Sequence, residues 1–594
     1  MSSVSLDCFG CPVDTASSSC LEKVNGYMDC VLGYGKNWGD GAKASEADPD
    51  SQMAFALSVD FQLCSYRFGD VVSSLSSKPS ELLPSKDDVS VPSAREDQAS
   101  LRARLYIEAL RNWIPLGNPG GAAELYYQAV RIFPSDLFAL KRAQLLYFVV
   151  GQPDRMLSVV ESEDVRGIRS FHFDNKSPYF HGMRSFALEQ NGRLDEALSA
   201  AETALAVKKD DLWAQHGLAH VTYFKGSLLE GLSRFVSFSD SWATGCSFME
   251  SHNWWHVAVF LLDMRRNRDA LEVVRRKAWG IDKSNVQDQL GALGFLLKLE
   301  IRLRLEGEAG GEGMASVKEL QREREVGSGV IKEILEDVLQ SARSSGTLSL
   351  HAEPLFDCLA AMALSFTGCE TELKSHLEGV RSVCGSVKKG VEERRRFAEV
   401  WEETVELCGR LWSEGPEVAV GLLRLEPGFC LLIGSYEQCD VLREAGILGI
   451  LQRGKLGSSD TREIWAEAVR ASGGGKGGGD EPHGTHLSME MRRATFKDPL
   501  PLESFRSTCL RGVSESDSEK IMRFLQDRIT EGERGPAVPN YFLLRAAVYL
   551  TPGDRRGDCV KVLAAFLDLC KEYGQAALPP QLQALKKQHL NGFS

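Results

Sequence analysis

Apolar residues recur at intervals of three and four along much of this chain, most clearly between about residue 103 and residue 280. That spacing places apolar side chains on one face of an α-helix. Four glycines end apolar runs here, Gly117, Gly151, Gly192 and Gly226, and they stand 34, 41 and 34 residues apart. A period of about 34 residues is that of the tetratricopeptide repeat, a pair of antiparallel helices. The pattern predicts five stacked helical hairpins, with an insertion inside the interval of 41 residues.

Small residues begin the second helix of the predicted hairpins, at Ala122, Ala197 and Gly231, where the two helices approach each other closely. A glycine between the helices supplies the left-handed backbone that ends the first one. Trp254 falls where the repeat pattern expects a buried aromatic residue, so we interpret it as core. Because one hairpin cannot bury its apolar face alone, neighbours must stack. The predicted fold class is all-α, a tetratricopeptide-type α-solenoid with irregular helical extensions.

The rest of the chain shows weaker patterns. Residues 1–48 predict coil with one or two short helices, and residues 51–68 predict an amphipathic helix. No stretch alternates apolar and polar residues for long enough to build a sheet. The sequence predicts an N-terminal segment and linker (1–92), a repeat array (93–310) and a Gly/Glu-rich linker with a helix (311–345). C-terminal helical repeats (346–455), a flexible Gly-rich insertion (456–500) and a terminal helical region (501–594) follow.

Composition and charge narrow the function classes. The chain has 594 residues, is 43% hydrophobic and carries a formal net charge of −13. Such an acidic balance argues against nucleic-acid binding, which needs clustered Lys and Arg. No apolar run reaches the roughly 20 residues that span a bilayer, and we see no secretory signal at the N-terminus. The 15 cysteines lack framework spacing, so we expect reduced thiols and a cytoplasmic protein.

Most catalytic motifs are absent from the sequence. It contains no GxxxxGK[ST] phosphate loop and no GxSxG nucleophile elbow. Cys8 and Cys11 form a lone CxxC, which is too few ligands for a zinc finger, so we interpret them as ordinary loop cysteines.

Two stripes of histidine and aromatic residues are the strongest chemical signal. In the predicted first helix of the fourth hairpin, residues spaced three and four apart share one face: Trp213, His216, His220 and Tyr223. The next hairpin carries a similar stripe: His252, Trp255 and His256, with Asn253 beside them. Because stacked helices lie about 8–10 Å apart, imidazoles on the two stripes can meet.

Three hypotheses explain these stripes. In the structural one, the histidines, tryptophans and Asn253 hydrogen-bond one another and fix the hairpin junction. In the second, the stripes line a concave ligand pocket formed by these eight residues. In the third, His216, His220, His252 and His256 hold a divalent metal ion, since imidazole suits zinc, copper, iron or nickel. The HExxH pattern of hydrolytic zinc sites is absent, because His216-Gly-Leu-Ala-His220 lacks the Glu.

Several stretches carry a resemblance to a known family: SPYFHGMRSFALEQNGRLDEA, DLWAQHGLAHV, HNWWHVAVFLLD and, further downstream, LLIGSYEQCDVL. With residues 104–156, they make most of the chain from about residue 7 to 455 similar to the tetratricopeptide repeat protein 38 family. The resemblance implies a helical repeat protein, usually cytosolic, and brings no established reaction. The chain departs from the family where Tyr106 replaces a usual His and where residues 434–437 read Gly-Ser-Tyr-Glu.

From these patterns we expect a cytosolic binding or scaffold protein. Its His/Trp-lined groove would take a protein segment, a peptide or a small molecule. The alternative is a metal- or histidine-dependent hydrolase or transferase acting on a small metabolite in a closed cavity. We favour binding over catalysis. The sequence pattern requires no cofactor. If one is bound, a divalent metal ion is the candidate.

Overall fold

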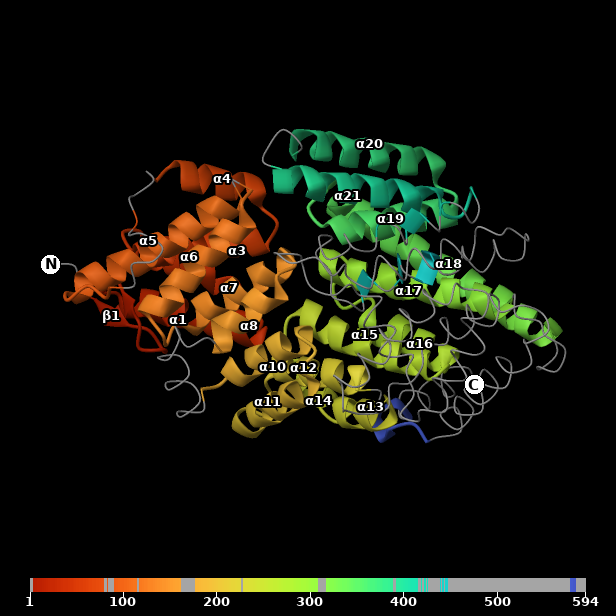
Figure 1. Cartoon of the computed structure of the whole chain (residues 1–594), viewed down its shortest axis with the longest axis horizontal. Coiled ribbons are helices and arrows are strands. Elements are labelled where there is room, and N and C mark those ends of the chain that lie inside the picture. The colour runs from red at the N-terminus through yellow and green to blue at the C-terminus, as the bar shows by residue number, and fades with distance from the viewer. Residues whose placement is uncertain are drawn as a thin grey trace, which may run out of the picture. The chain divides into compact units, whose positions relative to one another are not determined.

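The computed structural model of the chain is built almost entirely from α-helices (Figure 1), which confirms the all-α class. It divides into two compact units, the first comprising residues 1–221 and 237–249, the second residues 222–236 and 250–594. The structure describes the following residues: 4–78, 83, 90–114, 117–161, 177–225, 228–307, 317–387, 392–414, 418, 421–422, 425, 438–439, 441–442, 444–446 and 577–583.

The N-terminal segment is more ordered than its composition predicts. A small antiparallel hairpin pairs β1 (Ser5–Leu6) with β2 (Pro12–Val13). Four helices follow: α1 (Ser18–Gly33), α2 (Asp40–Ala47), α3 (Gln52–Cys64) and α4 (Phe68–Ser76). The expectation of coil with short helices for residues 1–48 is therefore wrong at α1.

Helix α1 forms for local reasons that the sequence already contained. The Ser17 side chain accepts a hydrogen bond from the Cys20 N–H, so it caps the N-terminus. Cys20, Val24, Tyr27 and Val31 then repeat at helical spacing, and all four are buried. The many Ser, Gly and Asp residues around this stripe make the composition of the segment resemble that of coil.

Helical pairs follow in the region of the predicted repeats. Their bounds, pair by pair, are α5 (Arg95–Trp113) with α6 (Pro119–Ile132), α7 (Leu137–Val149) with α8 (Pro153–Glu161), α10 (Phe180–Gln190) with α11 (Leu194–Val207), α12 (Leu212–Phe224) with α13 (Leu228–Val236), and α15 (Ser247–Asp263) with α16 (Asn267–Val273). The short α14 (Ser239–Trp242) precedes the last pair.

The turns inside the first three pairs have the predicted backbone. Gly117, Gly151 and Gly192 have φ angles of 56°, 69° and 72°, the left-handed region that favours glycine. Gly226 lies outside the described residues, as do most of the predicted insertion in the interval of 41, the Gly-rich stretch 456–500 and most of residues 501–594.

Successive helices of the first unit pack on one another. Contacts run from α5 to α6, α6 to α7, α7 to α8, α8 to α10 and α10 to α11. Such nearest-neighbour packing is what a repeat array requires. The winding of these pairs into a solenoid stays a prediction.

The second unit continues with longer helices after a π-helical turn at Val274–Ala278. These are α17 (Val286–Gly307), α18 (Val317–Ser345), α19 (Pro354–Thr367), α20 (Glu370–Val387) and α21 (Glu392–Arg410), with a 3-10 turn at Thr347–Ser349. Helix α19 packs against α17, α18, α20 and α21, so it forms the centre of this part. None of the helices within the described ranges has the length and apolar character needed to cross a bilayer.

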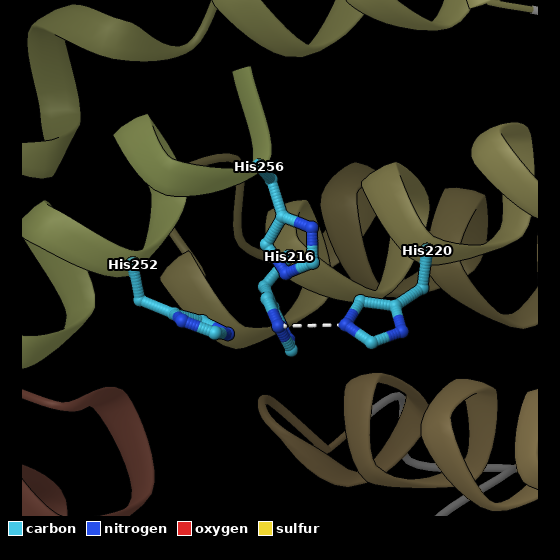
Figure 2. A group of neighbouring side chains, drawn as sticks. All are labelled: His216, His220, His252 and His256. Carbon is cyan, nitrogen blue, oxygen red and sulfur yellow. Dashed lines mark hydrogen bonds between the residues drawn. The ribbon is translucent and has the colours of Figure 1, made fainter. Parts of the chain in front are cut away.

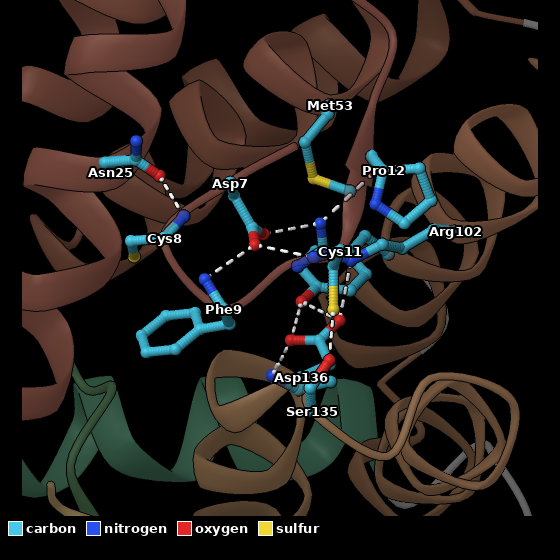
Figure 3. Close-up of polar contacts among 12 residues, drawn as sticks. Asp7, Cys8, Phe9, Cys11, Pro12, Asn25, Met53, Arg102, Ser135 and Asp136 are labelled. Carbon is cyan, nitrogen blue, oxygen red and sulfur yellow. Dashed lines mark hydrogen bonds and ion pairs between the residues drawn. The ribbon is translucent and has the colours of Figure 1, made fainter. Parts of the chain in front are cut away.

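A buried ion-pair network ties the N-terminal hairpin to the first helical pairs (Figure 3). Arg102 donates to Asp7 and to Asp136 at 2.7 Å each, and all three side chains are fully buried. Asp136 also accepts from the Tyr106 hydroxyl at 2.8 Å and caps α7 through the Ala139 N–H. Asp136 thus links α5 to α7, and Arg102 links both helices to Asp7 of the hairpin.

The CxxC cysteines flank the turn of this hairpin, as Figure 3 shows. Asp7 accepts hydrogen bonds from the N–H groups of Phe9 and Cys11, which closes the turn. Burial raises the pKa of the Cys8 thiol to about 12 and also raises that of Cys11. Both thiols are therefore protonated and poorly nucleophilic at neutral pH.

We expect Asp136→Ala to destabilise the protein by about 3–5 kcal/mol, because it leaves the Arg102 guanidinium buried with one partner fewer. Asp136→Asn is the matched control, since it retains a capping side chain and a hydrogen-bond acceptor and should cost less. Urea unfolding followed by circular dichroism measures both. A loss below about 1 kcal/mol for Asp136→Ala would show that the network contributes little.

Candidate functional site

Helix α12 carries the first predicted stripe, and its start is set by Asp211. The Asp211 carboxylate accepts from the N–H groups of Trp213 and Ala214 at 3.1 Å each, an N-terminal cap. From that start, the spacing of three and four residues puts Trp213, His216 and His220 on one face. All three are buried, with 6%, 3% and 1% of their surface exposed.

The two imidazoles of α12 point at each other. The Nε2 atoms of His216 and His220 are 2.9 Å apart, and the His216 ring lies 4.8 Å from the Trp213 ring. On its other side, His220 Nδ1 is 3.7 Å from a carboxylate oxygen of Glu189 on α10. Gln190 donates to the same carboxylate oxygen at 2.6 Å. A carboxylate near Nδ1 favours the tautomer with a proton there and leaves the Nε2 lone pair facing His216.

A buried lysine lies against the same tryptophan. Lys141 Nζ is 3.7 Å from the centre of the Trp213 ring and 4.7 Å from that of Tyr34. Burial lowers the Lys141 pKa well below its ordinary value, so the neutral amine is favoured. Among the described residues, neither Lys141 Nζ nor Trp213 Nε1 has a hydrogen-bond acceptor. Two buried donors thus lack partners at this face of α12.

Helix α15 carries the second stripe, in the second unit. His252 stacks on Trp255 with 5.4 Å between ring centroids and an interplanar angle of 6°. The His252 and His256 rings are 4.7 Å apart, and the Trp255 and His256 rings are 4.9 Å apart. Trp255 also contacts the Cα position of Gly291 on α17, where an added Cβ would lie 3.7 Å from its ring.

The boundary between the two units falls within α12 and within α15. In the first unit, Tyr34 stacks on Trp213 at 5.1 Å and contacts Phe248 at 6.0 Å. In the second unit, Tyr223 packs edge-on against Phe260 at 5.4 Å.

Four imidazoles carried by these two helices form one group (Figure 2). One ring nitrogen from each of His216, His220, His252 and His256 lies within 4.8 Å of the others, and all four residues are buried. Figure 2 shows His216 between His220 and His252, with His256 above it. We call these residues the four-histidine group.

Two of the predicted site residues have other surroundings. The Tyr223 hydroxyl donates to Asp263, which also accepts from Arg302 at 2.5 Å, so Tyr223 belongs to an ion-pair network. The structural hypothesis required Asn253 to hydrogen-bond the neighbouring rings. Asn253 is fully buried, and within the described ranges its amide makes no hydrogen bond, so that part of the hypothesis is wrong.

Sequence reasoning missed Glu189 and Lys141. Both lie in helices of other pairs, and neither belongs to a motif that spacing could reveal. No protein-family model matches this chain, and no solved structure matches it. The resemblance to the tetratricopeptide repeat protein 38 family therefore stays a prediction.

The pKa of Asp211 gives a pH-dependent prediction. Burial raises it from 3.8 to about 6, against the opposing effect of the Ala214 and Trp213 N–H donors and of Lys141. Because the folded state then holds this proton more tightly than the unfolded state, stability falls as pH rises from about 4 to about 6. The loss is at most about 3 kcal/mol.

The Asp211→Asn side chain still caps α12 and cannot titrate. We therefore expect the stability of this variant to change less than that of the wild type between about pH 4 and about pH 6. At pH 7 the variant should be more stable than the wild type. Thermal unfolding at several pH values measures this. Asp210→Asn removes the neighbouring exposed charge as a control. Parallel curves for wild type and Asp211→Asn would contradict the assignment.

Proposed function

We propose that this chain is a helical-repeat binding protein whose ligand is a d-block metal ion held by the four-histidine group. The observation that carries the proposal is the convergence of four buried imidazole nitrogens within 4.8 Å. Imidazole is the side chain that zinc, copper, nickel and iron share as a ligand. The facing Nε2 atoms of His216 and His220 share at most one proton, and an ion between them would use both lone pairs.

The distances approach those of a bound ion. Nitrogens held tetrahedrally around one zinc ion at about 2.1 Å lie about 3.4 Å apart. No separation in the group exceeds 4.8 Å, so binding would move the rings by at most about 1.4 Å relative to one another. Glu189 lies 3.7 Å from His220 Nδ1, so a shift of about 0.5–1 Å would let it accept from that N–H and orient the ring, as carboxylates do for metal-binding imidazoles.

Burial and ligand number favour binding over catalysis. The four histidines are between 1% and 7% exposed, which leaves no open surface for a peptide segment at the rings. Hydrolytic zinc sites keep a position for water and use three protein ligands, whereas four imidazoles fill a tetrahedral shell. Lys141 Nζ and Trp213 Nε1 would donate to an acceptor group of a small anion beside the ion.

We expect protein purified without a polyhistidine tag to bind about one zinc or copper ion at this group. The double variant His216→Ala/His256→Ala should lower the number of bound ions by one, measured by elemental analysis after dialysis. His181→Ala is the matched control, because His181 is 4% exposed and lies outside the group. An unchanged ion count in the double variant would refute the proposal.

Glu189→Gln should keep the site but weaken metal binding by about 10- to 100-fold, because the carboxylate beside His220 Nδ1 is lost. Competition with a chelating dye measures the affinity. Equal affinities for Glu189→Gln and wild type would show that Glu189 does not orient His220.

A further inference from the structure

A second group of metal-ligand side chains lies wholly inside the second unit. His351 precedes α19, Asp357 sits in the first turn of α19, and His376 is on α20. One possible ligand atom from each lies within 4.8 Å of the other two. This group shares no residue with the four-histidine group, and no feature of the sequence singled it out.

The separations between its donor atoms are those of neighbouring ligands on one ion. His351 Nδ1 is 3.0 Å from Asp357 Oδ1, and His376 Nε2 is 3.5 Å from the same oxygen. The Asp357 carbonyl oxygen is 3.1 Å from His376 Nε2. Adjacent ligands held at about 2.1 Å are about 3.0 Å apart in an octahedron and about 3.4 Å apart in a tetrahedron.

A neutral His376 ring cannot donate to both of the oxygens that its nitrogens face. His376 Nδ1 faces the Leu348 carbonyl at 3.1 Å, and Nε2 faces the Asp357 carbonyl at the same distance. Both oxygens only accept, and a neutral imidazole has a single N–H to donate. Either an ion or an extra proton must stand between His376 and the oxygens around it.

The Asp357 carboxylate also needs a positively charged neighbour. Asp357 is fully buried, and its Oδ2 atom has no hydrogen-bond partner in the part of the chain that the structure describes. An ionised carboxylate in such a place needs a positive neighbour. No described lysine or arginine forms an ion pair with Asp357, and its ion-pair partners among the described residues are His351 and His376.

The backbone is shaped to place His351 here. His351 has a φ of 47°, a left-handed conformation that a residue with a side chain adopts at an energetic cost. Its ring lies against α20 at Gly379, where an added Cβ would be 2.2 Å from Nε2. Only glycine at position 379 leaves room for the ring, so Nδ1 is turned toward Asp357.

We propose that His351, Asp357 and His376 form a binding site for a divalent d-block metal ion, with two imidazoles and one carboxylate as ligands. The proposal does not depend on the four-histidine group. Three protein ligands leave coordination positions for water or a further ligand. The His351 side chain is 9% exposed, whereas Asp357 and His376 are 0% and 1% exposed, so solvent reaches the site past His351.

The test measures Co²⁺ binding to the full-length chain by visible absorption, in the His216→Ala/His256→Ala background that removes ligands of the other group. We expect one Co²⁺ per chain, displaced by Zn²⁺. Adding His351→Asn should weaken Co²⁺ binding at least about 10-fold, because one of three ligands is lost.

Gly379→Ala is the sharper variant, since it changes no ligand atom. Alanine favours a helix over glycine by about 1 kcal/mol, so the helix itself should not suffer. The added Cβ displaces the His351 ring, and we expect the same loss of Co²⁺ binding as for His351→Asn. Gly385→Ala, on the same helix with nothing within 4 Å of the added Cβ, is the matched control and should bind Co²⁺ as the background does.

Two results would overturn the proposal. One is equal Co²⁺ binding in the background, His351→Asn and Gly379→Ala proteins. The other is no Co²⁺ binding in the background together with a melting temperature that chelator leaves unchanged, which would make the group a protonated His376 paired with Asp357. If the background does not fold, the same variants are made in the wild type, where the expected change is a bound-ion count lower by one.

Discussion

Buried polar atoms need partners, and this requirement organises the molecule more than any single apolar contact does. Arg102 is fully buried and stays charged because Asp7 and Asp136 meet it from two other segments. Arg142 is paired in the same way with Asp60, which also accepts from Tyr27. Each network joins helices that are distant in sequence, so the polar interior fixes which helices can be neighbours.

The same requirement identifies the places where the protein alone is incomplete. Asp357 keeps one carboxylate oxygen without a described partner, and Lys141 and Trp213 keep donors without described acceptors. Asp357 belongs to one histidine group, and Lys141 lies against Trp213, whose ring is 4.8 Å from that of His216 in the other group. A buried polar atom that lacks a partner is costly, so its position next to convergent imidazoles points to a bound cation or anion.

The two histidine groups differ in how local their construction is. His351 and Asp357 are six residues apart and His376 follows on the next helix, so a short segment with a left-handed turn and Gly379 suffices to build that group. The four-histidine group instead takes its residues from two helices, α12 and α15, with 31 residues between His220 and His252.

The sequence by itself determined the all-α class, the helical pairs and the left-handed glycines at Gly117, Gly151 and Gly192, because all of these follow from local spacing and backbone preference. It also marked the His216/His220 and His252/His256 faces, since residues four apart share a helix side. Only the tertiary structure placed Glu189 behind His220, Lys141 on Trp213, and His376 against Asp357. Those pairings join helices across a packed interior, and no local pattern records which buried side chains will meet there.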